Sequence, residues 1–356
     1  MHALTPARLR DAYEEALKFD HPLTSHITTD QFSRSYPRTP EWVVGPFQRD
    51  DALTFRQASE WPDPADIGWR NGFVFNPSIL NADGELHLFY RASPRKESMS
   101  SRIGHAVYTR SAGWIDDPAN PVVISTFDNE GLSVEDPKVY RRHDGLYVMF
   151  YNGIWATDGA DELTRYPSPG YPLDEVGCDI MVATSADLQS WTKHGLAVPY
   201  EISRGWAKGA VIPRSPRGDA VRVGGEYIMY LSEGCNGTMT VGRSTDLLTW
   251  EFRAEPYLDL TAWGGSLFEV ATAVVRDDDS DIVLDFFYND ADGQFAAGQA
   301  RYSRRDPFRQ RELNKGGALA WGGFAEWDGA LYFAQGWDAP EGSRELYFYR
   351  ETDAHA

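Results

Sequence analysis

Charged and amide side chains recur at matching positions in five β-rich segments of the chain. The set comprises Asn76, Glu135, Asp136, Lys208, Glu269, and Glu326 or Asp338. Carboxyl groups brought to one place can divide the work of breaking a glycosidic bond. One protonates the departing oxygen, and a second group activates the attacking water or stabilises that nucleophile. Crowded carboxylates also raise one another's pKa, which would keep one of them protonated at neutral pH.

Each of these residues begins or follows the start of a repeated unit. A unit is a strand, a tight turn and a second, aromatic-rich strand; the turns are Asp83-Gly84, Asp144-Gly145, Gly224-Gly225, an acidic turn at 277–281, and Asp328-Gly329. Asp-Gly and Gly-Gly tolerate the positive φ of two-residue hairpin turns. The units start near residues 76, 135, 208, 268 and 323, with spacings of 59, 73, 60 and 55.

This spacing, with about four strands per unit, is typical of a β-propeller. We therefore predict an all-β, five-bladed β-propeller whose inner strands gather the polar residues. A β-sandwich, or a six-bladed propeller with one blade hidden in the N-terminal segment, remains the rival fold. Two further turns, Ser185-x-Asp187 and Ser244-x-Asp246, are each followed by a Trp, and we expect both aspartates to cap their turns.

The N-terminal segment differs from the repeats. Thr5 to Phe19 is a helix candidate, with Thr5 as cap and Pro6 in the first turn. Residues 21–66 read as an extended lead-in, so the expected division is residues 1–66 for helix and lead-in and residues 67–356 for the propeller catalytic domain. The segment from Ile154 to Glu175 is rich in Pro, Gly, Asp and Tyr and is expected to be a loop over one face.

The amino-acid composition limits the classes of partner that the chain is expected to bind. The chain has 356 residues and a formal net charge of −19, which disfavours nucleic acid and anionic membrane surfaces. Two cysteines make no disulfide framework, and residues 1–20 lack an apolar signal core, so we expect a cytoplasmic protein. The eight histidines show no zinc-site spacing, and we predict no metal and no cofactor.

Aromatic residues make up 13% of the chain, which suits both β-structure and stacking on an oligosaccharide or glycoside substrate. Nothing decides the oligomeric state, so a homo-oligomer stays open.

From Phe73 to Asp338 the chain resembles glycoside hydrolase family 130, the β-mannoside phosphorylases and β-mannosidases. The matching pieces are Val74-Phe-Asn-Pro-Ser78, Leu88-Phe-Tyr-Arg91, Val134-Glu-Asp-Pro-Lys138, Tyr147-Val-Met-Phe-Tyr151, Ser185–Trp191, Lys208-Gly-Ala-Val-Ile-Pro213 and Ser244–Trp250. The resemblance implies a five-bladed propeller with Asp136 as the general acid, in some members through a sugar hydroxyl. It implies that Asn76, Arg91 and Asp338 contact the sugar, with Glu135 beside them. Lys208 would lie where phosphorylases hold phosphate.

The chain departs from the family at three places. Lys138 stands where Arg is usual, Gly209 where Asn is usual, and Ser232-Glu233 where phosphorylases carry a His-Arg pair that helps to bind phosphate. A phosphate dianion needs positive charge and donors around it. Because Glu233 and Glu269 add carboxylates, we favour water as the nucleophile, activated by one of these two glutamates in a single inverting step. That step requires carboxyl groups roughly 6.5 to 9.5 Å apart.

Other interpretations remain open. A β-mannoside phosphorylase would use inorganic phosphate as co-substrate, and a glycan-binding propeller would not catalyse at all. An arabinofuranosidase of the family 43 type would show Asp-Pro in the first blade, where this chain has Asn76-Pro77. Asp136 can also be a turn residue before Pro137. Lys208 can be a solvated side chain, and either glutamate can be a hydrogen-bonding neighbour of the sugar.

Overall fold

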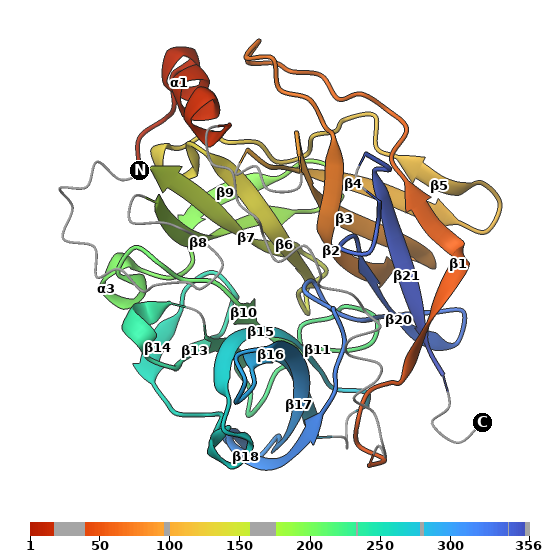
Figure 1. The fold of residues 1–356 in the computed structure, drawn as a ribbon, viewed down its shortest axis with the longest axis vertical. Helices are drawn as coiled ribbons and strands as arrows, with labels where there is room; N and C mark the ends of the chain where they lie inside the picture. The colour runs from red at the N-terminus through yellow and green to blue at the C-terminus, as the bar shows by residue number, and fades with distance from the viewer. Residues whose placement is uncertain are drawn as a thin grey trace.

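The computed structural model describes residues 1–17, 40–95, 100–156, 176–232, 234–277, 281–340 and 342–352. Five sheets are arranged around a common axis, so the chain is a five-bladed β-propeller and the predicted fold is confirmed (Figure 1). Within each blade consecutive strands pair antiparallel, which lets tight turns connect them.

The blades follow the predicted repeats. Blade one contains β2 (Phe73–Ala82), β3 (Glu85–Ser93), β4 (Arg102–Thr109) and β5 (Gly113–Asp116); blade two contains β6 (Ser133–Arg141), β7 (Tyr147–Ala156), β8 (Val176–Ser185) and β9 (Thr192–Leu196). Blade three contains β10 (Ala210–Val211), β12 (Tyr227–Leu231), β13 (Thr240–Ser244) and β14 (Glu251–Ala254). Blade four contains β15 (Ser266–Val274), β16 (Ile282–Asn289), β17 (Phe295–Ser303) and β18 (Asp306–Lys315), with β11 (Pro213–Arg214) parallel to β15. Each predicted start lies on the first strand of a blade or two residues before it.

Blade five joins the two ends of the chain. Its strands are β19 (Ala325–Trp327), β20 (Ala330–Gln335), β21 (Glu345–Glu351) and β1 (Phe47–Arg56). β1 pairs antiparallel with β21, from Phe47 opposite Glu351 to Arg56 opposite Glu345. A strand from within the lead-in range therefore completes the last sheet and covers an edge that would otherwise be exposed. Phe47 packs its ring against Phe324 and Phe333, with centroids 5.5 and 4.9 Å away.

The predicted N-terminal helix is confirmed as α1 (Pro6–Ala16). Thr5 Oγ1 accepts a hydrogen bond from the Arg8 amide at 3.3 Å, as expected of a cap. Ala16 is fully buried in a cluster with Leu132 and Ile154 of blade two, so α1 covers part of that blade. The short helices are η1 (Asp128–Glu130), α3 (Tyr200–Ser203), η2 (Cys235–Gly237) and η3 (Thr261–Trp263). In the described part of the chain no helix combines the length and apolarity needed to cross a membrane.

The two Ser-x-Asp turns have the predicted caps. Asp187 Oδ1 accepts from the amides of Gln189 and Ser190 at 3.0 and 2.8 Å. Asp246 Oδ1 accepts from the amides of Leu248 and Thr249 at 2.9 and 2.8 Å. These aspartates therefore stabilise turns at the blade edge. Of the segment expected to be a loop, Ile154 to Ala156 finish β7, and residues 157–175 lie outside the described part.

One buried carboxyl in blade four predicts how stability depends on pH. Asp285 on β16 is fully buried and accepts hydrogen bonds from Gln299 Nε2 at 2.8 Å and from the Ala318 amide at 3.1 Å. Burial outweighs these bonds and raises the pKa of Asp285 to about 8. The folded protein thus keeps this proton over a range in which the unfolded chain, with its carboxyl pKa near 4, has lost it.

Because the unfolded state binds fewer protons between about pH 4 and pH 8, this group lowers stability as the pH rises through that window. We expect the Asp285→Asn variant to lose a slope of up to about 1.4 kcal/mol per pH unit relative to the parent. Urea unfolding of both proteins at several pH values measures that difference. Parallel stability curves for the two proteins would show that the buried carboxyl is ionised.

Candidate active site

Two β-bulges carry Asn76 and Asp136 to the same place. The pairing of β2 with β3 breaks between Phe75 and Ser78, and the pairing of β6 with β7 breaks between Glu135 and Lys138. The extra residues are Asn76-Pro77 and Asp136-Pro137, and proline cannot donate to a strand ladder. Asn76 and Asp136 have φ of 43° and 53°, a left-handed conformation that Asn and Asp tolerate better than most residues. Such strain is often found at functional sites.

A chain of hydrogen bonds orients the two side chains. Trp337 Nε1 donates to Asn76 Oδ1 at 2.7 Å, and Asn76 Nδ2 donates to Asp136 Oδ1 at 2.7 Å. An indole N–H can only donate, so it must face the amide oxygen of Asn76. The amide nitrogen of Asn76 is thereby directed at Asp136. Blade five, through Trp337, thus helps to position a carboxylate on blade two.

Two cations from other blades flank the carboxylates of blade two. Arg91 on β3 forms an ion pair with Glu135 and lies 3.4 Å from Asp136 Oδ1. Lys208, which precedes β10, places Nζ 3.2 Å from both Glu135 Oε1 and Asp136 Oδ2. All four residues are buried, with Glu135 at 0% and Asp136 at 8% exposure. Blades one, two and three therefore meet at one charged cluster.

The protonation of Asp136 differs from the sequence-based expectation. Burial by itself would raise the pKa of Asp136, but Lys208, Arg91 and the Asn76 hydrogen bond outweigh burial and hold that pKa well below its usual range. The expectation that crowded carboxylates keep one carboxyl protonated is therefore wrong for Asp136 in the substrate-free protein. Arg91 and Lys208 come from other blades and lie within 3.4 Å of this carboxylate, and the sequence does not give such distances.

Glu269 on β15 lies beside the same cluster. It is 6% exposed, and its Oε2 accepts a hydrogen bond from Trp321 Nε1 at 3.1 Å. A side chain on Gly209, the neighbour of Lys208, would place Cβ 2.8 Å from Glu269 Cγ and 2.7 Å from Ser232 Oγ. Gly209 also has a φ of +62°. Glycine is therefore required for Glu269 to lie this close to Lys208.

The remaining predicted residues fall in different places. Asp338 is half-buried, follows Trp337 directly, and accepts hydrogen bonds from Gln335 Nε2 at 2.5 Å and Tyr349 OH at 2.6 Å. The two alternatives to Asp338 are more exposed to solvent. Glu326 is exposed, and Asp328 pairs with Arg110 while its side chain is 63% exposed. Glu233 lies outside the described residues.

Sequence reasoning missed three side chains here: Trp321, Trp337 and Lys138 as a buried contact. Lys138, two residues beyond Asp136, donates from Nζ to the Ala271 carbonyl at 2.6 Å. Both tryptophans adjoin glycines near the start and end of the fifth repeat, and that shared pattern was the available signal. Among the described residues, His, Cys, Asp and Glu side chains form no metal-binding group of three or more.

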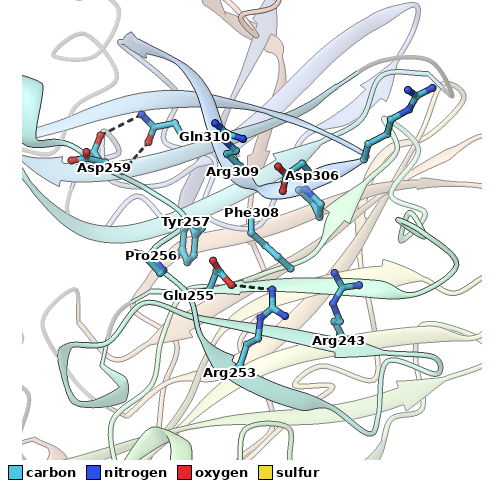
Figure 2. Close-up of a pocket in the computed structure, with 12 residues that line it drawn as sticks. Arg243, Arg253, Glu255, Pro256, Tyr257, Asp259, Asp306, Phe308, Arg309 and Gln310 are labelled. Atoms are coloured by element: carbon cyan, nitrogen blue, oxygen red, sulfur yellow. Dashed lines mark hydrogen bonds and ion pairs between the residues drawn. The ribbon is translucent and has the colours of Figure 1, made fainter.

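A separate hollow of about 580 Å³ lies between the outer strands of blades three and four (Figure 2). Arg243 and Arg253 flank Phe308 there, with guanidinium carbons 5.4 and 5.6 Å from the ring centre, and Arg253 pairs with Glu255 at 2.9 Å. These residues belong to β13, β14, β18 and the loops next to them. The hollow is therefore distinct from the cluster on the inner strands.

Comparison with curated proteins gives matches to phosphorylases of β-mannosides. No protein-family model matches the chain. The chain is 26% identical over 141 residues to a β-1,2-mannobiose phosphorylase of Thermoanaerobacter sp. (strain X514); the match covers 36% of this chain and 41% of that relative. The chain thus spans well under half the length of this curated relative.

Solved structures share the fold over most of the chain. One belongs to the family 130 mannoside phosphorylases, which contain glycoside hydrolases that target β-1,2-mannosidic linkages in Candida mannan; its TM-score is 0.64 at 19% identity, covering 89% of this chain and 96% of that one. The β-1,2-mannobiose phosphorylase from Listeria innocua has a TM-score of 0.55 at 12% identity, covering 86% and 96%. The chain therefore shares the propeller fold of these proteins, and over 141 residues its sequence is similar to that of a β-1,2-mannobiose phosphorylase.

Proposed function

We propose that this protein cleaves β-mannosides by hydrolysis, with Asp136 as the proton donor. One observation carries the proposal: Asp136 lies buried on a strained bulge, surrounded by Asn76, Arg91 and Lys208 from neighbouring blades. Such a site can hold the sugar hydroxyls with charged donors while the carboxyl faces the bond to be broken. The resemblance to family 130 and the names of the relatives support mannosides as the substrate class.

Asp136 must take up a proton before it can donate one. In the free protein Lys208 and Arg91 favour its ionised form. A bound sugar would exclude water from the cluster, and loss of water raises the pKa of a carboxyl. We propose that Asp136, directly or through a sugar hydroxyl, is protonated in the substrate complex.

Water is the proposed nucleophile, and Glu269 is the proposed base, with Glu233 as the other candidate. Glu269 lies next to Lys208 through Gly209, where a larger side chain would displace it. A carboxylate there can accept a proton from water and repels a phosphate dianion. These features support hydrolysis, for which we propose a single inverting displacement.

Phosphorolysis is the second candidate. It is favoured by the two cations, Arg91 and Lys208, beside Asp136, because cations are what a phosphate dianion needs. The curated relative is also named a phosphorylase. In that case the product would be a mannose 1-phosphate.

Incubation with β-1,2-mannobiose and with aryl β-mannosides, with and without inorganic phosphate, separates these functions. We expect free mannose as the product and a rate that does not depend on phosphate. Formation of mannose 1-phosphate only when phosphate is present would establish the phosphorylase instead. Sugar binding without any turnover would indicate a glycan-binding propeller, and cleavage of aryl arabinofuranosides alone would indicate the arabinofuranosidase type.

A further inference from the structure

Lys138 links two blades that are not neighbours. It lies on β6 of blade two, is 5% exposed, and donates from Nζ to the carbonyl of Ala271 at 2.6 Å. Ala271 belongs to β15 of blade four, and blade three lies between these blades in the ring. The side chain therefore connects blade two directly to blade four, close enough to Asp136 for the two charges to interact.

A second cation makes a comparable cross-connection. Arg214 on β11 is 1% exposed and donates to the carbonyl of Ile79 on β2 at 2.7 Å and to that of Gly322, before β19, at 3.0 Å. Arg214 thus connects blades one and five to the segment between blades three and four. Two buried cations, rather than apolar side chains alone, occupy the region where the inner strands converge.

The charges around Lys138 explain how an ammonium group remains there. Burial is the largest influence and lowers its pKa, and Arg214 lowers it further. Glu269 and then Asp136 act in the opposite direction, so that the pKa of Lys138 falls only to about 8. Coulombic attraction is mutual, so the ammonium group that Glu269 stabilises must in turn stabilise the Glu269 carboxylate.

The strand that carries Glu269, β15, is held less regularly by its neighbour than an unbroken strand would be. The pairing of β15 with β16 breaks twice, between Leu267 and Glu269 and between Val270 and Thr272. Ala271 lies in the second break, where the regular ladder does not hold it, and its carbonyl is the acceptor for Lys138. One side chain therefore anchors the irregular segment and supplies a positive charge to its glutamate.

We propose that Lys138 is a positioning residue that anchors the bulged strand of Glu269 through the Ala271 carbonyl and supplies a positive charge to the Glu269 carboxylate. This inference rests on the proposed role of Glu269 as the base. The charged groups that act on Lys138 are Glu269 on β15, Asp136 on β6 and Arg214 on β11; Lys208 and Arg91 also act on Asp136. Arginine would keep the charge, and it is the usual residue at this position in the family.

Three variants separate charge from anchoring. Lys138→Gln keeps a hydrogen-bond donor for Ala271 without the charge, Lys138→Met removes both, and Lys138→Arg restores the charge. A base must be ionised to act, so we expect Lys138→Gln to move the acidic limb of the pH profile of kcat/KM upward by about 1 pH unit. Lys138→Met should show the same shift with a further loss of kcat, and Lys138→Arg should return the limb towards that of the parent.

Lys193→Met is the matched control. Lys193 is a half-buried lysine of blade two, and it pairs with the buried Glu130 at 2.6 Å. We expect it to lower thermal stability and leave the pH profile unchanged. The same acidic limb in the parent and in Lys138→Gln, or an equal shift in Lys193→Met, would overturn the inference while leaving the proposed hydrolysis intact.

A second measurement does not depend on activity. Carbon-13 NMR of protein labelled at glutamate carboxyls, with the Glu269 signal assigned by Glu269→Gln, follows the titration of that group directly. We expect the pKa of Glu269 to be higher in Lys138→Gln than in the parent, because the variant lacks the neighbouring positive charge. An unchanged titration would refute the inference, whether or not the parent cleaves mannosides. If the parent shows no turnover but the titration of Glu269 still shifts in Lys138→Gln, the proposed function fails and the link between Lys138 and Glu269 stands.

Discussion

Asp136→Asn is expected to lower kcat for cleavage of a mannoside with a poor leaving group by about 10²- to 10⁴-fold. The amide occupies the same volume, tolerates the left-handed φ of this position and keeps an acceptor for Asn76, but it has no carboxyl proton to donate. Steady-state kinetics with aryl β-mannosides measures the effect. For a substrate with an acidic leaving group, kcat should fall much less, because such a leaving group departs with little protonation.

Asp285→Asn serves as the control for this experiment. It makes the same chemical change at another buried aspartate, which already holds a proton at neutral pH and lies on β16. We expect near-normal kinetics from it. Equal losses for good and poor leaving groups in Asp136→Asn would mean that Asp136 orients the substrate and is not the proton donor.

Arg91→Met is expected to reduce the free energy of unfolding by about 3–5 kcal/mol. The substitution leaves the fully buried Glu135 without its guanidinium partner and removes the bond from Arg91 Nε to Ser101 Oγ at 2.5 Å. Lys208, 3.2 Å from Glu135, compensates for only part of that charge. Chemical denaturation of the parent and the variant provides the measurement.

Arg110→Met is the matched control for stability. Arg110 also forms an ion pair, with Asp328, but the two side chains are 71% and 63% exposed. Exposed pairs contribute less than about 1 kcal/mol, so we expect a change within that limit. Adding Glu135→Gln to Arg91→Met should recover part of the lost stability, because it removes the unpaired charge. A loss in Arg91→Met no larger than in Arg110→Met would show that water or rearrangement satisfies Glu135.

Local sequence was sufficient for the blades because their signals lie close together in the chain. Asp-Gly and Gly-Gly turns set the hairpins, alternating aromatic strands mark the repeats, and the Ser-x-Asp turns form through bonds between residues two or three apart. The ladders break at Asn76-Pro77 and Asp136-Pro137, where proline cannot donate to the pairing. The sequence did not indicate that β1 completes blade five, since its pairing with β21 joins residues about 300 positions apart.

The sequence by itself determined the five-bladed architecture and placed Asn76, Glu135 and Lys208 with Asp136, because these follow from repeated local patterns. Only the tertiary structure decided how those residues affect one another. Trp337 meets Asn76 from 261 positions away, and Lys138 meets Ala271 from 133 positions away. The ionised state of Asp136 likewise depends on Lys208, 72 positions later. Protonation and orientation depend on distances in space, and no local pattern specifies a distance between blades.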